Sequence, residues 1–222
     1  VEKCRNTHKC FVSASFSYYN IDSICRLKPA SYRLDITVFD TGWDGQSIPE
    51  KRRNFMKNPK VAVIMGSDSD FEKLKGCLSM LKKFQIDADV NVISAHRTPE
   101  AAEQFAKSAE ENGIEVILAA AGKAAHLGGV LAAFTTLPVI GIPIKSSTMD
   151  GMDSLLSMVQ MPKGIPVATV AIDGGDNAAI LAAQMLSLKY DYLKDLLRQF
   201  KKDMADEVMK KNEKIKELVK SL

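Results

Sequence analysis

The chain has 222 residues, enough for one domain with a substantial core, and its 30 lysines and arginines nearly balance 27 aspartates and glutamates. The basic residues are dispersed and no stretch approaches the roughly 18 consecutive apolar residues of a membrane span, so neither nucleic acid nor a membrane is an expected partner. The apolar run at 11–16 is broken by serines and too short for a secretion signal of about 7–15 apolar residues, which favours a cytoplasmic location.

Residues 1–55 differ in composition from the rest of the chain. They hold eight of the fifteen Phe, Tyr and Trp residues, whereas all ten methionines lie at position 56 or beyond. Our first hypothesis is that this extension consists of upstream codons read in frame and is not part of the native product. A transit peptide is the alternative, because the first 34 residues are rich in Arg, Lys and Ser, but acidic residues follow them. In either case we expect the extension to carry no chemistry.

The four cysteines predict no metal site. Cys4, Cys10 and Cys25 lie in the extension, and their spacing, with His8 nearby, matches no established zinc pattern. Cys77 stands alone in the rest of the chain. We therefore expect free thiols in a reducing compartment and no bound metal.

After the extension, short β-branched runs alternate with stretches of helical period, such as the apolar repeat from Phe71 to Phe84. Thr98 followed by Pro99 is typical of a helix start, as N-cap and first helical residue. Runs that are apolar on both faces indicate a parallel sheet covered by helices on both sides. Residues 56–188 are therefore predicted to form a three-layer, doubly wound α/β sandwich with about five strands. These strands are expected at 61–65, 88–93, 115–121, 138–144 and 166–172.

Residues 189–222 contain no glycine or proline and predict one long C-terminal helix. Apolar residues recur at steps of three and four among many charges, which gives the helix a single apolar stripe. The stripe must be buried, and the pattern leaves two partners open, its own domain or a neighbouring subunit. The stripe consists of Leu193, Leu197, Phe200, Met204 and Val208.

The candidates for chemistry directly follow the strands, because parallel α/β sheets bind ligands beyond the carboxyl ends of their strands. The first strand is followed by Gly66, Ser67, Asp68, Ser69 and Asp70. Glycine permits close approach of a ligand, and hydroxyls beside a helix N-terminus suit a phosphate. The carboxylates suit ribose hydroxyls. An ordinary capped turn explains the same residues, and on this loop alone it is the preferred interpretation.

The second strand is followed by Ser94, His96 and Arg97, immediately before the helix start. The planar guanidinium of Arg97 suits a phosphate, and an imidazole such as that of His96 transfers protons near neutral pH. A structural histidine would be expected within the strand rather than after it. The two residues therefore predict a phosphate site beside an acid/base group.

The third strand is followed by small residues, including Gly122 and Ala124, which leave room for a planar ring. His126 either closes that space or is an ordinary helical histidine, and Lys123 fits a solvated charge. The loop and helix after the fourth strand give no independent signal. Taken together, the loops fit proton transfer on a phosphorylated, ribose-linked small molecule.

Six segments of the chain form a recognisable series, in the order VAVIMGSDSD, SAHRTPE, AGKAAHLGG, LPVIGIPI, DSLLSMVQMP and GIPVATVAI. Together they resemble the phosphoribosylaminoimidazole carboxylase catalytic-subunit family, and within it the class I N5-carboxyaminoimidazole ribonucleotide mutases. The resemblance covers about residues 56–188 and implies a flavodoxin-like fold, purine biosynthesis and a homo-octamer whose C-terminal helices pack on neighbours.

The resemblance implies a role for each candidate residue. The phosphate and ribose would be held by Ser67, Ser69, Asp70, Ser94 and Arg97. The aminoimidazole and the moving carboxyl group would be surrounded by Gly122, Ala124, His126 and Leu127, with His96 as general acid/base. The implied reaction moves a carboxylate from the exocyclic nitrogen to the ring carbon, through aminoimidazole ribonucleotide and trapped carbon dioxide. It needs no ATP, metal or organic cofactor.

Two alternatives remain beside the mutase. The related direct carboxylase adds carbon dioxide to aminoimidazole ribonucleotide, but there we expect lysine in place of Arg97. A non-catalytic, phosphoreceiver-like module would need an aspartate after the third strand, which here ends in Ala121 and Gly122. Lys123 and Gly128 depart from the family pattern A-G-G-A-A-H-L-P-G without removing a proposed role.

Overall fold

The computed structural model describes residues 58–147 and 149–222, which form a five-stranded parallel sheet in the order β2-β1-β3-β4-β5. Its strands are β1 (Lys60–Met65), β2 (Asp87–Val92), β3 (Ile114–Gly122), β4 (Val139–Ile144) and β5 (Ala168–Thr169). The helices are α2 (Phe71–Lys83), α3 (Pro99–Ser108), α4 (Leu127–Phe134), α5 (Met152–Val159), α6 (Gly175–Leu186) and α7 (Asp191–Lys220), with 3-10 turns η2 (Asp68–Asp70) and η3 (Met149–Gly151). The predicted fold class and the long C-terminal helix are confirmed.

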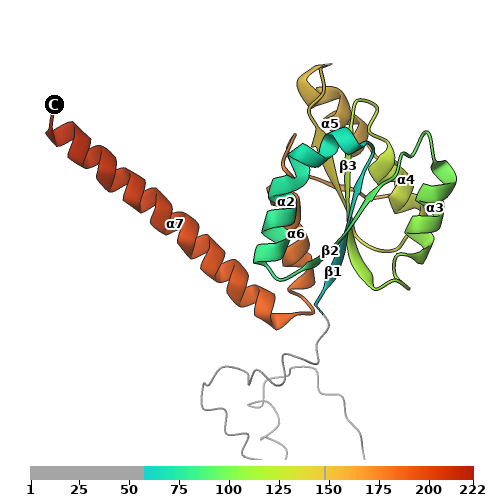
Figure 1. Cartoon of the computed structure of the whole chain (residues 1–222), viewed down its shortest axis with the longest axis horizontal. Helices are drawn as coiled ribbons and strands as arrows, with labels where there is room; N and C mark the ends of the chain where they lie inside the picture. The colour runs from blue at the N-terminus through green and yellow to red at the C-terminus, as the bar shows by residue number, and fades with distance from the viewer. Residues whose placement is uncertain (1–57, 148) are drawn as a thin grey trace, which may run out of the picture. The chain divides into compact units, whose positions relative to one another are not determined.

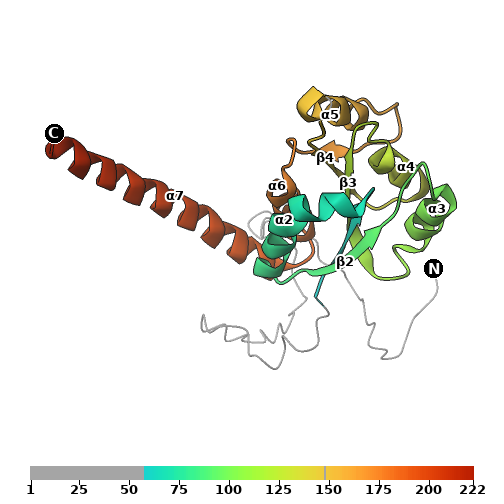
Figure 2. The same cartoon turned by 45° about the horizontal axis from the view of Figure 1, so that its top comes forward.

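The sheet separates two apolar cores, because alternate residues of each strand point to opposite faces. In β1, Val61, Val63 and Met65 belong to the core that contains residues of α2 and α6. Ala62 and Ile64 belong to the core that contains residues of α3 and α4. Figures 1 and 2 both show these helix pairs on opposite faces of the sheet.

The first four strands agree with the predicted ranges to within one residue at each end, but β5 is shorter than predicted. It covers Ala168–Thr169 instead of 166–172. The chain still follows β4 beyond this point, since the amide of Asp173 donates to the carbonyl of Pro143 at 2.8 Å. Pro143 has no amide hydrogen to donate in return, so the regular ladder cannot continue past it.

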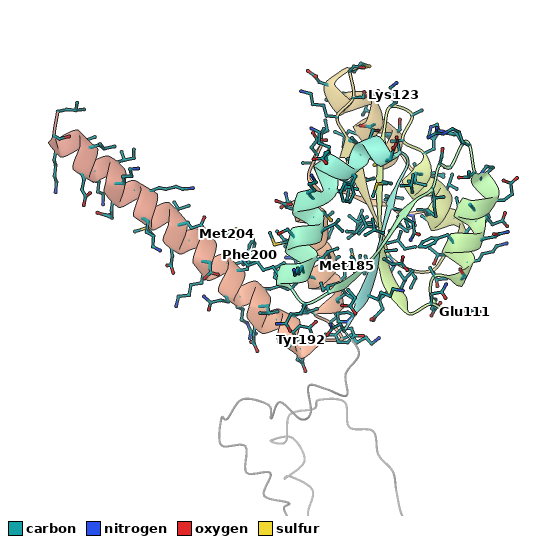
Figure 3. The ribbon with its side chains drawn as sticks, in the orientation of Figure 1. Glu111, Lys123, Met185, Tyr192, Phe200 and Met204 are labelled. Atoms are coloured by element: carbon teal, nitrogen blue, oxygen red, sulfur yellow. The ribbon has the colours of Figure 1, made fainter. Side chains whose placement is uncertain are left out.

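Helix α7 packs on its own domain only near its beginning. Leu193 is fully buried in the core with α2 and α6, and Phe200 lies edge-on to Phe84 with 5.7 Å between ring centroids. From Met204 onward every residue is exposed, along the part of the helix that Figure 3 shows extending away from the sheet. Burial on its own domain therefore accounts for the first part of the stripe, and the part from Met204 to Val208 needs another explanation.

The predictions about residues 1–55, including those for Cys4, Cys10 and Cys25, lie outside the described residues. Cys77 lies within them as a buried free thiol, and burial, aided by the charge of Asp176, raises its pKa to about 12. Among the described residues, no helix has the length and apolar character that crossing a bilayer requires.

Replacing Leu193 with alanine tests whether the beginning of α7 belongs to the core of the domain. Leu193→Ala leaves a cavity at a fully buried position and should lower the free energy of unfolding by about 2–5 kcal/mol. Leu188→Ala is the matched control, because Leu188 is 86% exposed just before the helix and should cost less than about 0.5 kcal/mol. Urea unfolding measures both, and equal losses would contradict this packing.

Candidate active site

The strand order brings three loops together at one edge of the sheet. β1 lies between β2 and β3, with Met65 paired to Val92 on one side and to Ala120 on the other. The order 2-1-3-4-5 places its topological switch point between β1 and β3, which is where doubly wound sheets bind ligands. All ten residues predicted for the site end or follow these three strands.

The loop after β1 is a turn that presents two hydroxyl groups. The Oγ of Ser67 accepts hydrogen bonds from the amide of Ser69 at 3.3 Å and from its hydroxyl at 2.9 Å, so it caps the η2 turn. The amide of Gly66 donates to the carbonyl of Ala120 at 3.0 Å and ties the loop to β3. The capped-turn interpretation is therefore correct for the free protein, and it leaves Ser69 exposed.

Asp70 is a buried carboxylic acid at the junction of η2 and α2. Its burial raises the pKa of its carboxyl, and the nearby charges of Asp68 and Asp173 add to the effect. A hydrogen bond from Ser69 and one from the backbone of Ser67 oppose the shift without cancelling it. When ionisation of a carboxyl group is costly, a ligand that donates hydrogen bonds stabilises the charged form, as ribose hydroxyls do.

Arg97 joins the first loop to the second. Its Nη2 donates to the carbonyl of Gly66 at 3.3 Å, and its Nε donates to Oγ of Ser94 at 3.4 Å. The same Oγ accepts from the amide of Arg97 at 3.2 Å. The guanidinium is exposed but held between two loops, with the hydroxyl of Ser94 beside it. This arrangement supplies the fork of donors that favours binding of a phosphate.

Thr98 and Pro99 are the N-cap and first residue of α3, as predicted, but the side chain of Thr98 makes no capping bond. Instead its hydroxyl donates to the carbonyl of Ser94 at 2.9 Å and accepts from the amide of Ser94 at 3.1 Å. Thr98 therefore closes the loop that carries His96 and Arg97 and fixes the backbone of both.

His96 and His126 form a hydrogen-bonded pair across the second and third loops. Nε2 of His96 lies 3.0 Å from Nδ1 of His126, and the rings are nearly perpendicular with 5.1 Å between centroids. One nitrogen must donate and the other accept, so a single proton lies between them. Both side chains are exposed. The pair presents an acid/base group at the surface. The two histidines are thirty residues apart in the sequence, so no local pattern could have revealed their contact.

The third loop is built tightly against the sheet. A side chain at Gly122 would meet the carbonyl of Ile144 at 3.3 Å, so this position is closely packed. Lys123 has a φ of 56°, a left-handed conformation that costs a lysine roughly 1–2 kcal/mol. Ala124 is exposed, whereas the side chain of Leu127 is 2% exposed and belongs to the core, so only its backbone is available to a ligand.

Asp173 is a charged residue at this edge of the sheet that the sequence did not single out. It accepts hydrogen bonds from Nζ of Lys73 at 2.8 Å and from the amide of Lys145 at 2.9 Å. Burial opposes its ionisation, but these hydrogen bonds outweigh burial and lower its pKa. A backbone φ of 56° at Asp173, just before two glycines, is the local sign of the sharp turn that brings it here.

A hollow of about 450 Å³ has Glu115, Lys189 and Tyr190 among its lining residues, near the start of β3 and so at the other edge of the sheet. These three groups bond to one another, since Glu115 accepts from Tyr190 at 2.6 Å and pairs with Lys189 at 2.7 Å. The chemistry-bearing loops lie at the carboxyl edge instead. In residues 58–147 and 149–222, no three His, Cys, Asp or Glu side chains are grouped so that they could hold a metal ion.

The fold and the site define a member of a family of nucleotide carboxylases. The family model for AIR carboxylase matches residues 60–207, and the chain belongs to this family. Among curated relatives, it is 59% identical over 146 residues to the N5-carboxyaminoimidazole ribonucleotide mutase of Pyrococcus abyssi, which covers 66% of this chain and 84% of that protein. The family resemblance expected from the sequence is confirmed.

Two further comparisons extend this result. The chain is 48% identical over 164 residues to the phosphoribosylaminoimidazole carboxylase of Candida glabrata, covering 73% of this chain but only 29% of that longer protein. The crystal structure of Treponema denticola PurE matches with a TM-score of 0.66 and 30% identity, over 72% of this chain and 99% of that one. The domain thus recurs both alone and within a larger carboxylase.

Replacing Asp70 with asparagine should separate stability from binding. Because the folded protein raises the pKa of Asp70, ionisation costs stability as the pH rises through that pKa, and the cost vanishes below the unfolded pKa near 3.9. Asp70→Asn should therefore raise the melting temperature at pH 7 more than at pH 4, while weakening nucleotide binding roughly tenfold. Asp206→Asn, on the exposed part of α7, is the control for thermal melting and calorimetry. If Asp70→Asn melted at a lower temperature than the parent at pH 7, ionised Asp70 would not be a cost to the folded protein.

Proposed function

We propose that this protein is an N5-carboxyaminoimidazole ribonucleotide mutase, an isomerase that interconverts N5-carboxyaminoimidazole ribonucleotide and 4-carboxyaminoimidazole ribonucleotide in purine biosynthesis. The observation that carries the proposal is the hydrogen-bonded pair of His96 and His126, 3.0 Å apart, directly beside Arg97 at the switch point of the sheet. The match to the AIR carboxylase family and to mutase relatives supports the same conclusion.

The phosphate and ribose bind at the first and second loops in this proposal. Arg97 and the hydroxyl of Ser94 bind the phosphate, and their mutual hydrogen bond orients both groups before the ligand arrives. Ser67 and Ser69 add hydroxyl donors, and Asp70 accepts from the ribose. Binding energy from this end of the nucleotide holds the base at the histidine pair, where proximity replaces a bimolecular encounter.

The aminoimidazole and the carboxyl group occupy the third loop, against Gly122, Ala124 and the backbone of Leu127. The N–CO₂⁻ bond breaks as the exocyclic nitrogen gains a proton, which leaves aminoimidazole ribonucleotide and carbon dioxide. The ring carbon then forms a bond to that carbon dioxide and loses its proton. One proton is given and one is taken, so His96, partnered by His126, can serve both steps and end as it began.

The remaining parts of the proposal concern what the reaction does not require and where it occurs. The steps balance without ATP, metal or organic cofactor, and acid/base help accounts for about a hundred- to ten-thousand-fold of the rate. The carbon dioxide must stay trapped, which a closed pocket around the third loop would achieve. The proposed location is the cytoplasm, as expected from the sequence.

Direct carboxylation of aminoimidazole ribonucleotide is the second candidate, because the Candida glabrata relative carries the carboxylase name. Arg97 and the histidine of the third loop favour the mutase. The deciding experiment supplies the purified protein, without ATP or metal, with each nucleotide separately. Efficient conversion of N5-carboxyaminoimidazole ribonucleotide supports the mutase, whereas activity on aminoimidazole ribonucleotide alone, rising with bicarbonate, would replace it by the carboxylase. No conversion of either nucleotide would contradict both the mutase and the carboxylase proposals.

His96→Asn should slow turnover strongly and preserve binding. The asparagine cannot exchange a proton, so kcat should fall about 10²- to 10⁴-fold, while the nucleotide affinity changes only a few-fold because phosphate contacts remain. His126→Asn is the matched variant, and a smaller loss is expected because it removes the partner ring rather than the proposed acid/base. Steady-state kinetics and calorimetry measure these effects, and retained kcat in His96→Asn would remove this role.

We further propose that the protein is a homo-octamer. Helix α5 exposes three large apolar side chains at steps of four and three, the η3 turn before it exposes a fourth, each is at least 45% exposed, and α7 exposes the second part of its stripe. Apolar stripes of this kind favour burial against another subunit. The apolar stripe of α5 and η3 consists of Met149, Met152, Leu156 and Val159.

Truncation after Asp203 tests the contribution of α7 to this assembly. The shortened chain keeps Leu193 and Phe200, which pack on the domain, and loses the exposed part of the helix. Its assembly should therefore have fewer subunits, measured by light scattering, while the unfolding of the domain in urea is nearly unchanged. The same number of subunits after truncation would show that this part of α7 does not hold the assembly together.

A further inference from the structure

Lys123 combines two unfavourable features at one position. Its φ of 56° lies in the left-handed region, where a lysine is strained and a glycine would not be. Its side chain is exposed and makes no hydrogen bond or ion pair with any other residue in the described parts of the chain. No hydrogen bond or ion pair of this side chain within residues 58–147 and 149–222 therefore compensates for the strain. Strain of this kind persists where function requires it.

The other lysines at this edge of the sheet behave differently. Lys73 pairs with Asp173 at 2.8 Å, and Lys145 pairs with Asp150 at 3.2 Å, so each cation is matched by a carboxylate of the protein. Lys123 alone among these three keeps its charge available. The ammonium group of Lys123, in a candidate substrate loop, can therefore bind an anionic group of the ligand.

Lys123 and Arg97 lie on different loops, Lys123 on the loop that carries His126 and Arg97 on the loop that carries His96. Arg97 is tied to the first loop through Gly66, whereas Lys123 precedes His126 by three residues, at most about 11 Å along the backbone. Figure 3 shows Lys123 at the edge of the sheet beyond β3. Each histidine of the pair therefore has a cation in its own loop, Arg97 directly after His96 and Lys123 three residues before His126.

We propose that Lys123 binds the carboxylate that the reaction transfers. The inference rests on the proposed function, in which the nucleotide carries a phosphate at one end and a carboxylate at the other. Lys123 attracts the carboxylate in both carboxylated nucleotides, N-linked and C-linked. Aminoimidazole ribonucleotide has no carboxylate, so Lys123 contributes nothing specific to its binding. Lys123 is thus a residue that distinguishes carboxylated from uncarboxylated nucleotide.

The test measures binding rather than turnover, in the His96→Asn background so that the ligand is consumed far more slowly. Calorimetry gives the Kd of 4-carboxyaminoimidazole ribonucleotide and of aminoimidazole ribonucleotide for protein with Lys123 and for Lys123→Gln, Lys123→Gly and Lys123→Arg. Lys123→Gln and Lys123→Gly should weaken the carboxylated nucleotide about tenfold, and Lys123→Arg should retain its binding within a few-fold. The affinity for aminoimidazole ribonucleotide should stay within about twofold throughout.

Each other outcome overturns the inference in a recognisable way. Equal weakening of both nucleotides would mean that Lys123 shapes the loop, and no weakening of either would make it a solvated charge. Binding of neither nucleotide when Lys123 is intact would reject the proposed function itself. Lys123→Gly should also melt at a higher temperature than the parent, because glycine relieves the strain, so its loss of binding cannot be attributed to misfolding.

Discussion

The site depends on the position of β1 between β2 and β3. Parallel pairing puts the carboxyl ends of the three strands at nearly the same level, with Met65 facing Val92 and Ala120. The connections after β2 and β3 then leave toward the same face, because α3 and α4 belong to one core. Residues that lie thirty positions apart in the chain can therefore meet, as His96 and His126 do.

This arrangement concentrates groups that do not stabilise the free protein. Asp70 is a carboxyl group whose ionisation is made costly by burial, and Lys123 is a lysine in a backbone conformation suited to glycine. Elsewhere at the same edge, Asp173 is satisfied by two donors and its pKa is lowered. At this edge the donors of Asp173 outweigh its burial, whereas the two hydrogen bonds to Asp70 do not offset its burial.

The sequence predicts the buried strands of the sheet well, because each is a continuous apolar run whose ends can be seen in the sequence. It fails at β5, where the ladder is limited by Pro143 of the neighbouring strand rather than by its own residues. Thr98 shows a similar limit, since its position predicts a cap but its hydroxyl bonds to Ser94 instead. The loops of the candidate site follow from strand ends, whereas the contact between the two histidines requires the strand order.

Helix α7 joins two different environments within one unbroken element. Leu193 is part of the core at one end, and the C-terminus lies at the far end in Figures 1 and 2. Thirty helical residues span about 45 Å, and the helix runs thirteen residues past the family match that ends at 207. An unbroken helix anchored in a core transmits orientation as well as distance. The C-terminus is consequently a natural point for attaching a second domain at a fixed angle and spacing, without a flexible linker.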